Sequence, residues 1–252
     1  MNQAQKAEQF AKLHVTGSPI LLYNVWDAGS AKAVLDAGAK VIATSSWAVA
    51  EAHGYRDGEA IPVEFVEQVI ARITATIDAP VTVDFEGGYS EDDNVLAKNV
   101  TRLLDLGVVG INFEDRVVQG SGLYPADHQA RRIAAIREAA EKKGVKLFIN
   151  ARTDVFFQKG DASDFVDDAL ARGTRYTSAG ASGFFVPGLK EDAQIERLCD
   201  ALSLPVNVMI MSGVSPNKKL AELGVARISY GPIPHIEAMN NLRKRAVDTL
   251  AG

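Results

Sequence analysis

The chain has 252 residues, a length that one α/β barrel or two small domains would satisfy equally well. Its hydrophobic fraction of 47% and charged fraction of 23% are typical of a globular protein and exclude the disordered and fibrous classes. A formal net charge of -5 offers no basic surface for phosphate backbones or anionic lipid. We therefore expect no nucleic-acid partner.

The cysteine content and the N-terminal segment bear on the compartment. Cys199 is the single cysteine, which excludes an intrachain disulfide and a Cys-rich zinc site and is typical of a reducing environment. Segment 1–12 is polar and lacks the apolar core of a signal peptide, and no run approaches the roughly 18 apolar residues of a membrane span. The sequence predicts a cytoplasmic protein with no membrane partner.

Eight short apolar runs alternate with helical patterns along the whole chain. The predicted strands are 20–24, 41–44, 81–85, 109–114, 147–151, 183–186, 206–210 and 227–230. Helical patterns between them include 62–77, 92–106, 129–143 and 191–202. Nearly all-apolar strands are typical of a parallel sheet covered on both faces, and parallel strands need crossover helices.

A weak internal repeat supports this reading. The four copies begin at Asp36, Asp105, Ser178 and Glu222. Each copy contains a glycine suited to end a helix before the next strand, namely Gly38, Gly107, Gly180 and Gly224. Four copies indicate a single domain over 1–252. Eight βα units in this length predict a (β/α)8 TIM barrel, with a doubly wound open sheet as the alternative.

Acidic residues lie at the end of the third predicted strand, the part of a barrel strand where chemistry is located. Asp84 and Glu86 are two positions apart, so their side chains point to the same side, toward the barrel mouth. Two carboxylates this close repel each other unless a cation lies between them, and oxygen ligands favour Mg²⁺ or Mn²⁺. The pattern predicts a divalent metal site. The alternative is a loop-capping Asp84 beside a solvated Glu86.

The fourth and fifth strands add polar residues to the same rim. Asn112 and Glu114 alternate on strand four, and Arg152 and Asp154 end strand five. An arginine beside a metal site is suited to bind a substrate carboxylate or phosphate, and the alternative, compatible with this role, is a salt bridge to Glu114 or Asp154. Asp57, in a polar turn, either completes the metal shell or caps the next helix.

Further candidates for substrate binding lie at other strand ends. Ser45, Ser46 and Trp47 follow strand two and offer donors that suit an anion. Tyr23 is a candidate proton donor, and Asn207 either lines the pocket or turns the chain. The histidines form no triad with a nucleophile motif; they are His14, His53, His128 and His235.

Six segments taken together resemble the isocitrate lyase and phosphoenolpyruvate mutase superfamily. They are 24–31, 45–47, 56–57, 84–89, 112–115 and 151–154, and the match runs through at least the first two thirds of the chain. The acid-rich segment Asp84-Phe-Glu86-Gly-Gly-Tyr89, in register with the others, makes the resemblance specific. It implies a barrel whose last helix is exchanged between subunits of a homodimer or homotetramer. It also implies Mg²⁺-dependent chemistry on small α-oxo or enol carboxylates.

The resemblance also implies roles for individual residues. Asp84 looks like the direct metal ligand. The residues that look like water-mediated contacts of the ion are Asp57, Glu86 and Glu114. Arg152 and the segment 45–47 look like the clamp on the substrate carboxylate.

The segment after strand four departs from the superfamily pattern. Lyases carry a mobile Lys-Lys/Arg-Cys-Gly-His segment there, whereas 116–124 of this chain has no cysteine and also lacks the Lys-Thr-Asn of phosphonomutases. Arg116 and Gln119 are the nearest replacements. Gly120 and Gly122 would allow this segment to act as a lid, and a flexible surface connection is the alternative.

These observations lead to one leading hypothesis and two alternatives. The leading hypothesis is a Mg²⁺-dependent lyase or decarboxylase that cleaves a carbon-carbon bond in a small 2-oxo or 2-hydroxy carboxylic acid through an enolpyruvate-type intermediate. Its expected catalytic residues are Glu114, Arg116 and Arg152. The first alternative is a phosphonomutase or phosphonopyruvate hydrolase acting on a phosphorus-carbon bond. The second is a non-catalytic barrel that binds a metabolite.

Overall fold

The computed structural model describes residues 1–117 and 119–251, and in this part of the chain eight parallel strands form one sheet. The strands are β1 (Ile20–Leu22), β2 (Ile42–Ala43), β3 (Val81–Asp84), β4 (Gly110–Glu114), β5 (Phe148–Arg152), β6 (Gly183–Phe185), β7 (Val206–Met209) and β8 (Arg227–Ser229). Each lies within two residues of a predicted strand. They pair in the order β1-β8-β7-β6-β5-β4-β3-β2. A parallel bridge between Val25 and Thr44 joins the two ends of this order, so the predicted (β/α)8 barrel is confirmed.

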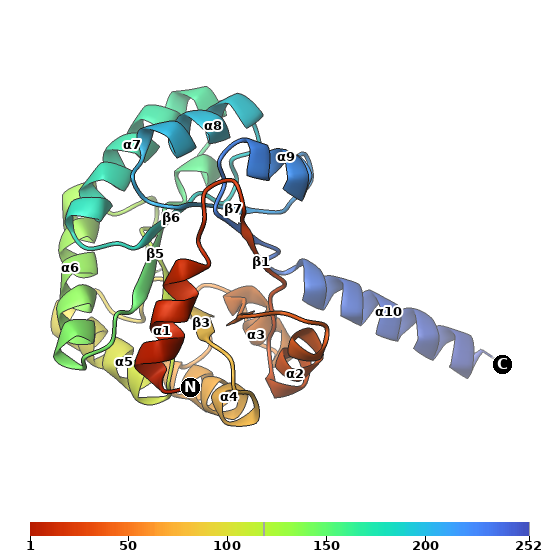
Figure 1. Ribbon diagram of the computed structural model, residues 1–252. Helices are drawn as coiled ribbons and strands as arrows, with labels where there is room; N and C mark the ends of the chain where they lie inside the picture. Colours follow the sequence, from red (N-terminus) through yellow and green to blue (C-terminus); the bar gives the residue numbers. More distant parts are fainter. Residues whose placement is uncertain (118, 252) are drawn as a thin grey trace.

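Helices alternate with the strands and surround the barrel (Figure 1). They are α1 (Gln3–Lys12), α2 (Ala28–Asp36), α3 (Ser46–Ala52), α4 (Val63–Thr76), α5 (Asp93–Asp105), α6 (Ala126–Lys142), α7 (Ala162–Ser178), α8 (Asp192–Ala201), α9 (Asn217–Glu222) and α10 (Ile233–Leu250), with a 3-10 turn η1 (Val155–Phe157) after β5. The predicted helices at 62–77, 92–106, 129–143 and 191–202 correspond to α4, α5, α6 and α8 within three residues at each end.

Burial explains why these segments fold as they do. β4 is buried at all five positions, as expected for a strand with side chains packed on both faces. α4 buries Val66, Val69, Ile70 and Ile73, whose spacing places them on one face of a helix. The four repeat glycines all have positive φ, so the predicted helix-ending role is confirmed.

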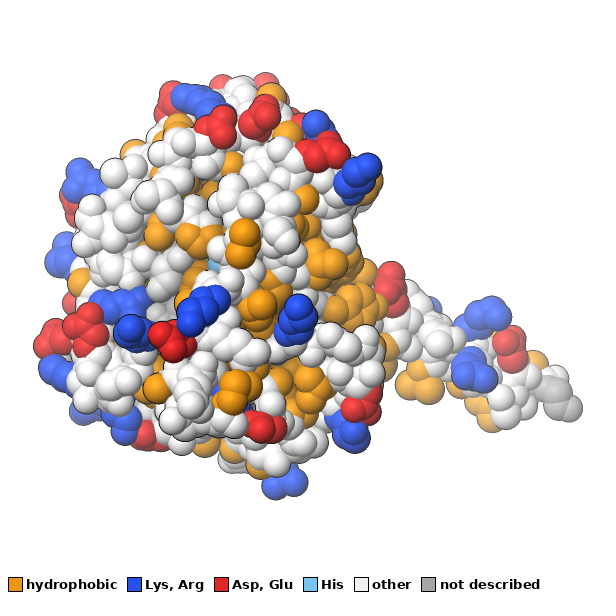
Figure 2. Space-filling view, in the orientation of Figure 1, with side chains coloured by type: hydrophobic (Ala, Val, Ile, Leu, Met, Phe, Trp, Pro, Cys, Tyr) orange, Lys and Arg blue, Asp and Glu red, His pale blue; other side chains and the backbone are white. Residues whose placement is uncertain are grey.

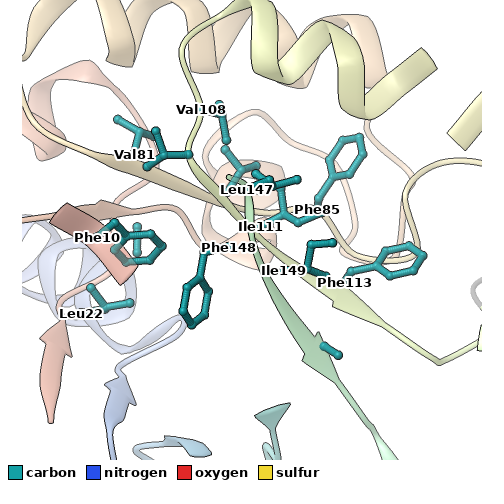
Figure 3. Packing of buried hydrophobic residues seen from close by; sticks show 14 of the residues in the cluster. Phe10, Leu22, Val81, Phe85, Val108, Ile111, Phe113, Leu147, Phe148 and Ile149 are labelled. Carbon is teal, nitrogen blue, oxygen red and sulfur yellow. The ribbon is translucent and has the colours of Figure 1, made fainter. Parts of the chain in front are cut away.

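One end of the barrel is closed by α1. Its Phe10 is fully buried and contacts the first residues of several strands (Figure 3). The ring of Phe10 lies 5.2 Å from that of Phe148, and a Cβ on Gly110 would come within 2.5 Å of it. Because this end is filled, ligands can reach the barrel only at the opposite end, where the strands finish.

The last helix is the exception to the barrel pattern. α10 projects away from the other elements (Figure 1), and Figure 2 shows hydrophobic side chains along it. Its exposed apolar residues are Ile236, Met239, Leu242, Val247 and Leu250. No helix in the described part of the chain combines the length and the apolar character that a bilayer span requires.

Candidate active site

A cavity of about 560 Å³ lies at the open end of the barrel. The last residues of five strands line it, namely Asp84, Arg152, Phe185, Met209 and Ser229. The sequence predicted functional side chains at two of these strand ends, Asp84 and Arg152, and both line the cavity.

One wall of the cavity is acidic. Asp84 accepts hydrogen bonds at Oδ2 from the backbone N of Ser46 (3.1 Å) and from its hydroxyl (2.9 Å). The same hydroxyl lies 3.1 Å from Oδ1 of Asp57. The Ser46 hydroxyl carries one proton and can donate it to only one of the two carboxylates. Its contact with the other carboxylate brings two oxygen atoms together and needs a further proton or a cation. Burial, followed by the charge of Asp84, raises the pKa of Asp57 above its ordinary value.

Glu86 stands behind this wall and is buried. Its Oε2 accepts a hydrogen bond from the backbone N of Glu59 (2.9 Å), and its Oε1 accepts one from the hydroxyl of Tyr89 (3.3 Å). Burial, and then the charges of Asp57 and Asp84, raise the pKa of Glu86 to about 8. The carboxylates are therefore close enough to oppose one another's ionisation.

This set of oxygen atoms fits a hard divalent cation. Within residues 1–117 and 119–251, no three acidic, histidine or cysteine side chains already surround a single point as a complete metal cage. Asp57 and Asp84 line the cavity, whereas Glu86 and Glu114 do not. One or two carboxylates with the other positions left to water or substrate is the arrangement that Mg²⁺ prefers.

Arg152 lies on the cavity wall between two carboxylates. Its Nε and Nη2 donate to the two oxygens of Asp154 at 2.6 and 2.9 Å, and Nη1 lies 3.0 Å from Oε2 of Glu114. Burial lowers the pKa of Arg152, but the charges of Glu114 and Asp154 outweigh it and raise this pKa above its ordinary value. The salt bridges considered as the alternative role of Arg152 are therefore present.

A buried cluster behind the wall fixes Asp154. Asp115 is fully buried and accepts a hydrogen bond at Oδ1 from the backbone N of Asp154 (3.1 Å). Its Oδ2 accepts from Nη1 of Arg172 (3.0 Å) and from the hydroxyl of Tyr176 (2.8 Å). The partner of Arg152 is thus held by the barrel itself.

Arg116 lies on the cavity wall at the start of the segment 116–124, for which a lid and a flexible surface connection are the alternatives. Its side chain is 42% exposed, and its Nε lies 3.7 Å from Oε1 of Glu114. Gly120 and Gly122 also line the cavity. Position 118 of this segment lies outside the described residues.

Comparisons with known proteins agree with this geometry. The family model described as phosphoenolpyruvate phosphomutase matches residues 10–250. The chain belongs to the phosphoenolpyruvate phosphomutase family. The resemblance to the isocitrate lyase and phosphoenolpyruvate mutase superfamily, and with it the expected class of lyase or mutase, is confirmed.

Three relatives illustrate the range of this family. A solved structure of a candidate phosphonomutase from Burkholderia cenocepacia J2315 has 46% sequence identity and a TM-score of 0.93, with 96% of this chain and 99% of that one covered. An uncharacterized protein of Mycobacterium tuberculosis is 33% identical over 226 residues, which cover 90% of this chain and 83% of the relative. An oxaloacetate decarboxylase of Pseudomonas entomophila is 27% identical over 242 residues, with 91% and 80% covered.

In this member of the phosphomutase family, two expected substrate-binding residues lie away from the cavity. Tyr23 is on the outer face of the barrel, where it is 44% exposed and its hydroxyl donates to Glu237 of α10. Asn207 is fully buried inside the barrel and accepts hydrogen bonds from Asn150 and Ser229. Neither residue lines the cavity, so the structure corrects both expectations. The cause is strand alternation, which directs Tyr23 outward.

The segment 45–47 differs in part from the expected anion cradle. Ser45 is the N-cap of α3, and its hydroxyl accepts a hydrogen bond from the backbone N of Ala48 at 3.4 Å. Ser46 bonds to the acidic wall, as described above. Trp47 lines the cavity, and its ring lies 5.8 Å from that of the buried His235. Ser46 therefore uses its donors on Asp84, whereas the Ser45 hydroxyl serves as an acceptor at the start of α3.

The cavity also has an apolar side, which the sequence predicted only in part. Phe157 and Phe185 line it without having been predicted, beside Met209 and Pro232, which end or follow strands seven and eight and for which pocket lining and a chain turn were the alternatives. Apolar residues at these positions resemble ordinary core residues in a sequence. The available signal for Phe185 was its place as the last residue of β6, whereas Phe157 lies in η1, beyond the end of β5.

Proposed function

We propose that the chain is a Mg²⁺-dependent lyase or decarboxylase that cleaves a carbon-carbon bond in a small 2-oxo or 2-hydroxy carboxylic acid through an enolate. The observation that carries this proposal is a cavity lined by groups of opposite charge. Asp57 and Asp84 line it with carboxylates, and Arg152 lines it with a guanidinium. A relative named as an oxaloacetate decarboxylase supports the carbon-carbon assignment.

The acidic wall would hold the ion. Asp84 and Asp57 are the residues in position to meet it from the cavity, and Glu86 and Glu114 would act from behind through water. Bound there, a divalent cation supplies electrostatic stabilisation for the negative charge that develops on the oxo oxygen of the substrate.

Arg152 would bind the substrate carboxylate. A guanidinium has five N–H donors, and the bidentate contact with Asp154 uses two of them. Donors remain on Nη1 and Nη2, and Arg152 lines the cavity. Because Asp154 and Glu114 already fix its plane, the guanidinium needs no reorganisation when the anion binds.

Arg116 would meet the fragment that leaves. Its side chain has the exposure to turn toward a ligand, and its only ion pair in the described part of the chain is the 3.7 Å contact with Glu114. A second carboxylate of the substrate next to this cation would be bound and oriented by its charge, while the electron pair released on bond cleavage moves to the enolate.

A specific observation favours a second candidate, phosphorus-carbon chemistry. The solved structure at 46% identity is named as a candidate phosphonomutase. Phosphoryl transfer needs cations around the transferred group, and Arg116 is the cavity-lining cation available besides Arg152 among the described residues. We rank this candidate second for that reason.

The test is a substrate screen with metal present and with metal removed. Oxaloacetate, malate-type acids and phosphonopyruvate are incubated with the protein in Mg²⁺ or in EDTA, and pyruvate, aldehyde or oxo-acid products and phosphate are measured. We expect turnover of an oxo or hydroxy acid that EDTA abolishes and that Asp84→Asn removes. The exposed Asp36→Asn is the matched control. Phosphate release from phosphonopyruvate would reverse the ranking, and no turnover of any acid would overturn both candidates.

The assembly and the location of the chain stay predictions. A homodimer or homotetramer with an exchanged last helix, and residence in the cytoplasm, are what we propose on the grounds given for the sequence.

A further inference from the structure

Two loops beside the acidic wall have an uncommon backbone conformation. Among the described residues, the non-glycine residues with positive φ are Glu59 (58°), Glu86 (49°) and Tyr89 (62°). Glu59 lies in the connection 53–62, which we call the Asp57 loop, and the other two lie in 85–92, the Glu86 loop. Residues with side chains avoid this region unless the surroundings hold them there.

The three residues are joined to one another by hydrogen bonds. The backbone N of Glu59 donates to Oε2 of Glu86 (2.9 Å), and the backbone N of Tyr89 donates to Oε1 of Glu59 (2.8 Å). The hydroxyl of Tyr89 donates to Oε1 of Glu86 at 3.3 Å and completes a closed triangle. Each strained residue is therefore bonded to the other two, across two separate loops.

The Glu86 loop is also fixed to the barrel from the other side. The buried Arg132 of α6 donates to the carbonyl oxygens of Gly87 (2.5 Å) and Ser90 (2.8 Å). The buried Asn99 of α5 donates to the carbonyl oxygen of Gly88 (3.0 Å). Two side chains thus hold three backbone carbonyl groups within residues 87–90. The Glu86 loop is the rigid partner, and Glu59 attaches the Asp57 loop to it.

We propose that Glu59 is a positioning residue that joins the Asp57 loop to the Glu86 loop, so that the two sides of the acidic wall are assembled before any ligand binds. Glu59 does not line the 560 Å³ cavity and therefore acts through its neighbours. Its carboxylate receives the N–H of Tyr89, and its own N–H orients the carboxylate of Glu86. The consequence for metal binding rests on the proposed function, whereas the joining of the loops does not.

The first experiment measures binding of Mn²⁺ alone by titration with electron paramagnetic resonance. The variants are Glu59→Ala and Glu59→Gln, with Glu64→Ala of α4 as a control that removes an exposed carboxylate. Glu59→Ala keeps the backbone N–H that donates to Glu86 and removes the carboxylate that holds Tyr89. Loss of such a supporting partner typically weakens metal affinity by about 10- to 100-fold, and we expect this for Glu59→Ala. Glu59→Gln keeps an acceptor for Tyr89 and should lose less. An affinity of Glu59→Ala within about twofold of the wild type would overturn the proposal.

The second experiment uses the metal-free protein and follows amide hydrogen exchange. In Glu59→Ala we expect faster exchange in peptides that cover 53–62 and 85–92, and in Glu64→Ala we expect wild-type exchange. If the wild type binds no Mn²⁺, the proposed metal dependence fails and exchange alone decides. Faster exchange in both loops then supports the joining role of Glu59, and unchanged exchange refutes it.

Discussion

At the scale of single residues, Glu86 shows the energetic consequence of gathering acids at one rim. Burial and the charges of Asp57 and Asp84 raise its pKa to about 8, against an ordinary value of 4.5. Between these two pH values the folded metal-free protein holds a proton that the unfolded chain releases. The contribution of Glu86 to stability is therefore fully present below about pH 4.5 and is lost as the pH rises through about 8.

The prediction from this shift concerns Glu86→Gln. Glutamine cannot ionise, so the free energy of unfolding of this variant relative to the wild type should increase from pH 5 to pH 9 in EDTA. Urea unfolding at the two pH values measures it, and Glu64→Gln, at an exposed position, is the control. A difference between Glu86→Gln and wild type that stays constant with pH would contradict the assignment.

A second residue-scale prediction concerns Arg152. Lysine keeps the charge but cannot make the two parallel hydrogen bonds to Asp154 while it faces Glu114. We expect Arg152→Lys to remain folded and to lose about 100-fold in kcat/KM, or about 2.7 kcal/mol of transition-state stabilisation. Steady-state kinetics with the substrate found in the screen measures this. The control is Arg175→Lys, in an exposed ion pair, which should behave as wild type. Wild-type kinetics for Arg152→Lys would exclude Arg152 as the residue that binds the substrate carboxylate.

The residue scale also shows what a sequence can and cannot reveal about a site. The predicted site residues Asp84 and Arg152 line the cavity, and both were recognisable from their strand-end position and side-chain type. Asp57 also lines it and was recognisable as an acid in a polar turn. The prediction that Tyr23 lines the substrate site was wrong, because side chains alternate along β1 and beyond it. This alternation directs Leu22 into the barrel and Tyr23 outward. The hydrogen bonds that Glu59 makes with Glu86 and Tyr89 could not be predicted, since nothing in the sequence shows that the two loops meet.

At the scale of elements, the sequence predicted strands best. Fully covered parallel strands leave nearly unbroken apolar runs, so all eight were found within two residues. α1 was harder because it is mostly polar and buries only Ala7 and Phe10. α3 was missed because its seven residues begin in the segment 45–47, whose small polar residues also suit a loop.

The Glu86 loop allows a prediction about how tightly elements pack. Gly88 has a φ of +80°, and an added Cβ would come 2.2 Å from Leu96 of α5 and 3.1 Å from Phe113 of β4. We expect Gly88→Ala to lower the free energy of unfolding by about 2 to 4 kcal/mol, because overpacking adds to the backbone cost. Gly107→Ala is the control, since its φ is +88° and its Cβ would meet nothing within 4 Å. Urea unfolding compares the two, and equal losses would show that packing contributes nothing.

At the scale of the whole molecule, two apolar surfaces lack a covering element in the described chain. The exposed apolar residues of α10 fall within about 140° of the helix circumference, so they form one stripe. Leu21 of β1 and Tyr23, just after this strand, are about half exposed in a groove of about 840 Å³ beside α2. An isolated amphipathic helix is marginally stable in water. The exchange of α10 between subunits would cover both surfaces, and it stays a prediction.

The matching experiment places a charge on the stripe of α10. Val247→Asp would bury a carboxylate in the predicted subunit contact, so we expect the dimer or tetramer to dissociate at concentrations where the wild type stays assembled. Asn241→Asp adds a charge on roughly the opposite side of the same helix and should leave assembly unchanged. Light scattering coupled to size-exclusion chromatography gives the mass of each species. A monomeric wild type, or equal behaviour of the two variants, would mean that the stripe of α10 faces no second subunit.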